Sequence, residues 1–185
     1  MGKFNFIKTE IEDLILVEPT VFGDSRGYFM ETYQKEEFKA GGIDVDFVQD
    51  NQSCSGKGVL RGMHFQKKNP QGKLVRVVSG AVYDVAVDLR KDSKTYGKWQ
   101  GFVLSAENKR QLYVPEGFAH GFVVKSNDAE VLYKVSNYYN PESECGIFWA
   151  DKTLNIDWGI DFEPILSEKD KNQPSLSEIN MEEII

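Results

Sequence analysis

The sequence is built largely from short runs in which apolar and polar residues alternate, separated by Gly, Asn, Asp and Pro. This period-two pattern, rich in β-branched and aromatic residues, predicts strands. We expect strands at 3–7, 13–17, 45–50, 59–66, 73–78, 81–89, 99–104, 110–114, 119–125 and 130–138. Many short strands joined by brief turns favour a β-sandwich or a small barrel.

Turn and helix signals complete this outline. Ser79-Gly80 separates two of the strand runs and predicts a tight turn, and therefore an antiparallel hairpin. Helix is expected only at 34–40 and at 175–184. A length of 185 residues, with no linker, internal repeat or low-complexity segment, predicts a single domain over residues 1–185.

Composition argues against several classes of protein. The formal net charge is −7 and no Lys/Arg cluster opposes it, so we expect no nucleic-acid partner. No apolar run approaches the roughly 20 residues of a bilayer span, and the first residues lack the pattern of a signal peptide. We therefore expect a cytoplasmic protein without a membrane partner. Cys54 and Cys145 form no CxxC motif, which argues against a disulfide framework or structural zinc.

The chain has only two histidines, and one of them lies in a recognisable motif. Pro115, Gly117 and His120 in VPEGFAHGF form a PxGxxH arrangement that resembles the second motif of the cupin family. Cupin metal sites also expect an HxH in the first motif, where this chain offers only His64. The resemblance favours the cupin barrel and, because ligands are missing, no metal. A site of two His with carboxylates stays open.

The second histidine, His64 in VLRGMHFQ, has two readings. It is either a core residue satisfied by hydrogen bonds or an acid/base group that titrates near neutral pH. Alternation places the side chains of Arg61 and His64 on opposite faces of the strand, unless a bulge at Gly62 turns one of them to the other face. In a neighbouring apolar run, Asp84 either meets solvent or lines a polar cavity, because aspartate is a poor strand former.

A longer set of motifs, in order from about residue 4 to residue 175, carries a second resemblance. The motifs are VFGDSRGYFMETY (21–33), FVQDNQS (47–53), VLRGMHFQ (59–66), QGKLVRVVSGAVYDVAVDLR (71–90), SAENKRQLYVPEGFAHGF (105–122) and LYKVSNYYNP (132–141). Together they resemble the dTDP-4-dehydrorhamnose 3,5-epimerase family. The resemblance implies a mostly β, cupin-type antiparallel β-barrel (jelly roll) with a few short helices. It also implies a homodimer that converts dTDP-4-dehydro-6-deoxy-D-glucose to dTDP-4-dehydro-L-rhamnose without metal or nucleotide cofactor.

The resemblance assigns catalytic roles to four residues. His64 corresponds to the base, and Asp170 to the carboxylate that orients it. Such a carboxylate fixes the tautomer of a histidine and favours its protonated form. Tyr133 corresponds to the proton donor and Lys73 to the cation near the developing enolate. Asp84 is the alternative partner of His64.

Substrate-binding roles follow from the same resemblance. They fall on Arg26, Glu31, Gln49, Asn51, Arg61, His120, Tyr139, Glu144 and Lys169. An arginine fork suits a diphosphate, and Tyr139 corresponds to the aromatic on which thymine stacks. An N-terminal region exchanged between subunits would bring Arg26 and Glu31 to the partner's site.

Some points stay open at this level. Gln52 departs from the FVQDNHS of many relatives and lies beside binding residues. An enzyme that inverts only C3 or only C5 would use the same base, acid and fold. A non-catalytic sugar-binding cupin would keep the barrel and have no use for a Tyr and a His across one cavity.

Overall fold

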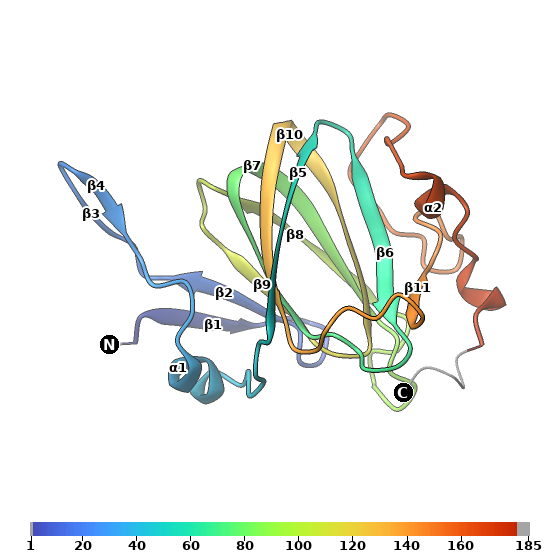
Figure 1. Cartoon of the computed structure of the whole chain (residues 1–185), viewed down its shortest axis with the longest axis horizontal. Helices are drawn as coiled ribbons and strands as arrows, with labels where there is room; N and C mark the ends of the chain where they lie inside the picture. Colours follow the sequence, from blue (N-terminus) through green and yellow to red (C-terminus); the bar gives the residue numbers. More distant parts are fainter. Residues whose placement is uncertain (1, 181–185) are drawn as a thin grey trace.

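The computed structural model describes residues 2–180 and is dominated by antiparallel strands (Figure 1). The strands in this range are β1 (Phe4–Lys8), β2 (Ile15–Pro19), β3 (Phe22–Asp24), β4 (Gly27–Phe29), β5 (Gln49–Gly56), β6 (Leu60–Gln66), β7 (Lys73–Asp88), β8 (Trp99–Ser105), β9 (Gln111–Val114), β10 (Phe118–Val135) and β11 (Glu144–Gly146). The helices are α1 (Lys35–Ala40), α2 (Glu168–Lys171) and the 3₁₀ helix η1 (Leu176–Glu178). None of the helices within the described residues has the length and apolar character to cross a membrane.

The strands form two layers, and the two long strands β7 and β10 run through both, with one half of each strand in each layer. β7 pairs with β9 through residues 73–76 and with β8 through residues 81–87. β10 pairs with β6 near its start and with β5 in its second half. The main core cluster combines residues from both parts of β7, such as Val75 and Ala86, so the layers pack face to face. This mostly β jelly roll confirms the predicted fold class, although its sheet is not closed into a barrel.

The signal at Ser79-Gly80 marks a bend, and the prediction of a hairpin there was wrong. β7 runs unbroken through this point and stays paired with β10 on both sides of it. Gly80 has φ of 72°, and a Cβ on it would lie 2.0 Å from the backbone oxygen of Asp128. Glycine is required because the two strands approach closely where the sheet bends.

Strands β3, β4 and β11 were not predicted, and most of the predicted strands differ from the structure only at their ends. The strands expected at 119–125 and 130–138 are one strand, β10, and the strand expected at 45–50 begins only at Gln49. The helix expected at 34–40 is confirmed as α1.

The C-terminal region differs more from expectation. In place of a helix over 175–184, the described part holds only the 3₁₀ turn η1, and residues 181–185 lie outside the described range. Ser175 caps this turn through a capping box with Glu178. The short helix α2, which was not predicted, carries Asp170.

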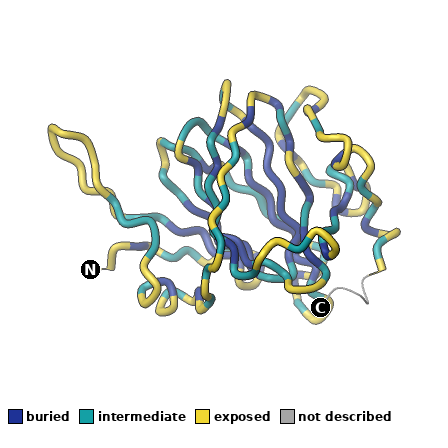
Figure 2. The backbone as a smooth tube through the Cα atoms, viewed as in Figure 1, coloured by how far each residue is buried: buried dark blue, intermediate teal, exposed yellow. Residues whose placement is uncertain are grey.

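Two further apolar clusters attach flanking segments to the sheet. α1 buries Phe38 against β1, β2 and β9, and the segment after β11 buries Trp158 in a cluster with Met63 of β6. The β3–β4 hairpin, in contrast, projects from the body of the molecule and is exposed along its length (Figures 1 and 2). It leaves Tyr28 and Phe29 more than 60% exposed, at 62% and 64%.

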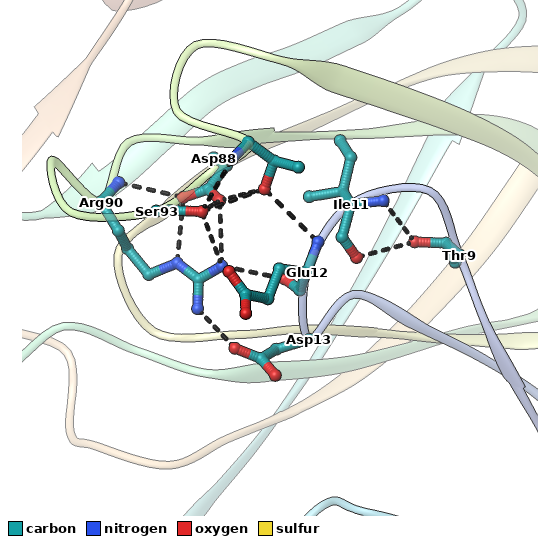
Figure 3. A network of polar contacts seen from close by, with 8 residues as sticks. Thr9, Ile11, Glu12, Asp13, Asp88, Arg90 and Ser93 are labelled. Atoms are coloured by element: carbon teal, nitrogen blue, oxygen red, sulfur yellow. Dashed lines mark hydrogen bonds and ion pairs between the residues drawn. The ribbon is translucent and has the colours of Figure 1, made fainter.

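A polar network fastens the loop after β7 to the turn between β1 and β2 (Figure 3). Asp88 is fully buried, and its carboxylate accepts hydrogen bonds from Arg90, Ser93 and Thr95. The Arg90 guanidinium also donates to Asp13 Oδ2 at 2.7 Å. Burial opposes ionisation of Asp88, but these hydrogen bonds prevail and hold the pKa of its carboxyl below the ordinary value.

Candidate active site

Most of the predicted site residues gather around one cavity of about 270 Å³. Its walls come from β5, β6, β7, β10 and β11, so both layers of the jelly roll contribute to it. The lining residues are Ser53, Arg61, His64, Phe65, Gln66, Gln71, Lys73, His120, Phe122, Tyr133, Tyr139 and Glu144. The cavity combines apolar walls with a few convergent polar groups, as ligand sites do.

His64 pairs with Asp170 across the edge of β6. The Nε2 atom of His64 lies 2.5 Å from Asp170 Oδ1, and the Ser167 hydroxyl accepts a hydrogen bond from the Asp170 backbone. Burial opposes ionisation of Asp170, but the hydrogen bond to His64 and its charge prevail, so the pKa of Asp170 lies below its ordinary value. An ionised Asp170 holds a proton on Nε2 and leaves Nδ1 as the basic nitrogen of His64.

His120 pairs with a different carboxylate from His64. His120 Nε2 lies 2.8 Å from Asp84 Oδ1, and both side chains are buried. The structure therefore pairs Asp84 with His120 and leaves Asp170 as the partner of His64. Asp84 does not meet solvent, and its Oδ2 has no hydrogen-bond partner among the described residues.

Arg61 and His64 line the same cavity, although simple alternation places them on opposite faces. The pairing of β6 with β10 is irregular between them, because two residues of β6, Gly62 and Met63, lie opposite the single residue Gly121 of β10. Gly62, with φ of 137°, occupies this bulge, and a Cβ on it would lie 2.5 Å from the Cα of Gly121. The bulge that the sequence analysis allowed for at Gly62 is therefore confirmed, and it overrides simple alternation. Arg61 also donates to Ser55 Oγ at 3.0 Å.

Lys73 and Tyr133 bring a cation and a phenol to the cavity. Burial lowers the pKa of Lys73 to about 8, while the charges of Asp84 and Glu144 oppose this change. Burial raises the pKa of the Tyr133 phenol, and Arg61 opposes that shift. At neutral pH, Lys73 is therefore mostly charged and Tyr133 holds its proton.

Glu144 links three predicted residues at the cavity rim. It forms an ion pair with Lys169 and accepts a hydrogen bond from the Tyr139 hydroxyl at 2.5 Å. Burial opposes ionisation of Glu144, but the bonds from Lys169 and Tyr139 prevail and keep its pKa below the ordinary value. The carboxylate thus fixes the Tyr139 ring beside the cavity mouth.

A second hollow of about 270 Å³ continues the cavity outward. Gln49 and Asn51 of β5 line it together with Gln71, Tyr133 and Tyr139, and the last three also line the first cavity. The two hollows share three lining residues and are therefore adjacent, and we call them the inner and the outer compartment of one elongated site.

Comparisons with known proteins identify the family of this chain. The family model described as dTDP-4-dehydrorhamnose 3,5-epimerase matches residues 8–178. The chain belongs to this family. A 3,5-epimerase of Shigella flexneri is 58% identical over 170 residues, which cover 91% of this chain and 93% of that protein. A relative of the same name from Methanothermobacter thermautotrophicus is 52% identical over 180 residues, with 96% and 97% covered.

A solved structure is similar over the whole described fold. The 3,5-epimerase from Legionella pneumophila, crystallised in complex with dTDP-4-keto-L-rhamnose, superposes with a TM-score of 0.94 at 48% identity. The match covers 98% of this chain and 97% of that chain. The jelly roll described above is therefore the fold of the 3,5-epimerase family.

Two residues singled out by the resemblance to the 3,5-epimerases lie away from the elongated site. Arg26 is on the projecting β3–β4 hairpin, where it forms an ion pair with Asp24 and its side chain is 88% exposed. Glu31 follows the hairpin and forms an ion pair with Lys3. A role for either in the site of the same chain has no support in this geometry.

Some lining residues were missed by sequence reasoning, and three of them are polar. These are Ser53, Gln66 and Gln71. Gln66 accepts a hydrogen bond from the backbone N of Asn140 at 2.8 Å, and Gln71 donates to the backbone oxygen of Asn137 at 2.7 Å. Together they hold the loop that carries Tyr139. Alternation offered a signal for two of them, because Ser53 follows Asn51, and Gln66 follows His64, by two positions.

Two further predictions concern the surroundings of the site. Gln52 is exposed, lines neither compartment and donates to Glu130. Within residues 2–180, no three His, Cys, Asp or Glu side chains lie close enough together to hold a metal ion. At the candidate site, the structure places two separate His–Asp pairs and a buried lysine.

Proposed function

We propose that this protein converts dTDP-4-dehydro-6-deoxy-D-glucose to dTDP-4-dehydro-L-rhamnose by inverting C3 and C5 of the sugar. It would act as a cytoplasmic homodimer that needs no metal or nucleotide cofactor. Family membership and the names of its relatives support this substrate and reaction. The observation that carries the proposal is that His64, backed by Asp170, and Tyr133 line one cavity from strand segments at different halves of β10.

The reaction needs three groups around the sugar. C3 and C5 both flank the C4 ketone, so removal of a proton from either carbon forms an enolate with its charge on the C4 oxygen. Return of a proton to the opposite face of the carbon inverts the centre. A base on one face, an acid on the other and a cation near the oxygen satisfy these needs.

The assignment of base and acid rests on where the two side chains originate. His64 lies on β6, which pairs with the first half of β10, whereas Tyr133 lies in the second half of β10, which pairs with β5. The two side chains thus reach the cavity from different layers, as a base and an acid on opposite faces of a ring require. Nδ1 of His64 accepts the proton, and the Tyr133 phenol, kept protonated by burial, donates one.

Lys73 is the group we assign to the developing oxyanion. It is buried in the cavity wall, where a charge interacts strongly with a ligand because water is excluded. Its pKa is about 8, so the charged form predominates below this pH. The negative charges of Asp84 and Glu144 favour the charged form. A lysine of this kind stabilises the enolate more than the ketone, and so accelerates proton removal.

The outer compartment is the proposed nucleotide site. Tyr139 is available for stacking on thymine, and Gln49 and Asn51 offer amide groups to the nucleotide. Arg61 reaches the inner compartment, where its guanidinium suits the diphosphate. His120, Glu144 and Lys169 complete the proposed binding set, and Arg26 and Glu31 would act in the site of the partner subunit.

Proton NMR of dTDP-4-dehydro-6-deoxy-D-glucose in D₂O tests the proposal. We expect the protein to place deuterium at both C3 and C5 and to form the L-rhamno product. Deuterium at only one carbon would indicate a single-centre epimerase. Binding without exchange at either carbon would indicate a non-catalytic sugar-binding cupin and would overturn the proposed function.

A further inference from the structure

Ser53 stands at the point where β5 passes from the outer to the inner compartment. Gln49 and Asn51 line the outer compartment, and Ser53 is the next residue on the same face of the strand. It lines the inner compartment together with His64 and Lys73. Its place on the strand therefore puts Ser53 beside the proposed sugar rather than the nucleotide.

The hydroxyl of Ser53 has no hydrogen-bond partner among residues 2–180, although its Oγ is shielded from solvent. The next serine on this face, Ser55, is different because its Oγ accepts a hydrogen bond from Arg61 Nε at 3.0 Å. A buried hydroxyl without a partner is unfavourable and rare in folded proteins. Since no hydrogen bond fixes its rotamer, rotation about χ1 lets the hydroxyl turn toward the cavity without losing a contact.

We propose that the Ser53 hydroxyl forms a hydrogen bond with the pyranose of the substrate and that Ser53 is a substrate-specificity residue. This inference rests on the proposed function. The pyranose offers hydroxyl groups and the C4 carbonyl, and a serine hydroxyl donates to a carbonyl or accepts from a hydroxyl. A partner supplied by the ligand explains why this oxygen has none among the described protein residues.

The variant Ser53→Ala tests the proposal through three measurements. We expect kcat/KM for epimerisation to fall by about tenfold to a hundredfold, the usual cost of one lost substrate hydrogen bond. The affinity for dTDP, which has no sugar beyond its deoxyribose, stays unchanged in calorimetric titration, whereas the affinity for dTDP-D-glucose falls. The melting temperature of the free protein does not fall, because the hydroxyl makes no hydrogen bond to another described residue of the protein.

Matched variants separate contact with the sugar from a structural role. Gln52→Ala changes the neighbouring side chain, which is exposed and bonded to Glu130, and leaves all three measurements unchanged. Ser53→Thr restores a hydroxyl and recovers part of the lost affinity for dTDP-D-glucose.

Several results would overturn the role of Ser53. An unchanged kcat/KM in Ser53→Ala would mean that the hydroxyl makes no productive contact. An equal loss of affinity for dTDP would assign it to the nucleotide, and a lower melting temperature with a parallel loss of activity would make its role structural. If the unaltered protein epimerises neither carbon, the proposed function fails. The two titrations then still decide whether Ser53 contacts the sugar.

Discussion

His64 and His120 lie directly opposite each other on β6 and β10, and each bonds a different buried aspartate through Nε2. The two pairs differ in access to the cavity. The side chain of His64 is 30% exposed, whereas that of His120 is 8% exposed. This difference fits His64 as the group that exchanges protons with a ligand and His120 as a more rigid part of the wall.

The Asp170→Asn variant tests the His64–Asp170 pair. An amide cannot hold the proton on Nε2 as a carboxylate does, so a fraction of the imidazole takes the wrong tautomer and loses its basic Nδ1. We expect kcat for deuterium exchange to fall by about 10²- to 10⁴-fold with little change in dTDP affinity. Asp161→Asn removes an exposed carboxylate from the same C-terminal segment and serves as the control. Full activity in Asp170→Asn would contradict the pairing.

The Asp84→Asn variant tests the charge on Lys73. The pKa of Lys73 is about 8, so the rate should decline as the pH rises through this value and the ammonium loses its proton. The Asp84 carboxylate raises that pKa, and its removal should therefore move the alkaline limb of the pH–rate profile to lower pH. The position of the limb does not depend on how much of the variant is folded. Asp128→Asn, an exposed change, should leave the limb in place.

Local pattern predicted the faces of strands well because a period of two is a property of the strand itself. Alternation separated Val82 and Ala86 from Val85 and Val87, and the structure places these pairs in different apolar clusters. It also placed Asp84 on the same face as Val82 and Ala86, but left open whether its carboxylate meets solvent or lines a polar cavity.

The path of the sheet could not be read in the same way. A glycine with positive φ serves a two-residue turn or a bend where two strands touch, and the sequence around Gly80 is compatible with both. The close approach of Asp128, from a distant part of the chain, selects the bend. The bulge at Gly62 likewise depends on contact with Gly121 of another strand, and it decides that Arg61 and His64 share a cavity.

The candidate site depended on more than periodicity. Asp170 lies on a helix of four residues, too short for a periodic signal, and only the family motif distinguished it from a solvated charge. In the structure Asp170 is buried and bonded to His64, and no local sequence pattern could have indicated either. Ser53 ends one of the family motifs (47–53) and Gln71 begins another (71–90), but neither was predicted to be a site residue. Their place in the site became visible only when the cavity brought distant strands together.

A mixing experiment tests exchange of the N-terminal hairpin between subunits. Arg26 lies far out on the β3–β4 hairpin, while His64 lies in the jelly roll. If the hairpin serves the partner's site, Arg26→Ala and His64→Ala are each defective alone, but a mixed dimer contains one site with both residues intact. We expect partial recovery of epimerase activity after the two variants are unfolded and refolded together. No recovery in a mixture whose mixed dimers are demonstrated by mass spectrometry would place Arg26 outside the partner's site.

The Asp88→Asn variant tests the network of Figure 3 as a source of stability. Asp88 is buried with three hydrogen-bonding partners, so loss of its charge leaves Arg90 without its main acceptor and should lower the free energy of unfolding by about 3–5 kcal/mol at pH 7.

The same variant should also change how stability depends on pH. Because the pKa of Asp88 is lowered in the folded protein, the unfolded chain binds more protons in acid. The contribution of Asp88 is thus complete above the unfolded pKa of about 4 and is lost as the pH falls through the folded pKa. Urea unfolding from pH 7 to pH 3 should show a weaker acid dependence in Asp88→Asn than in the unaltered protein, whereas Asp92→Asn, an exposed change in the same loop, should change neither quantity.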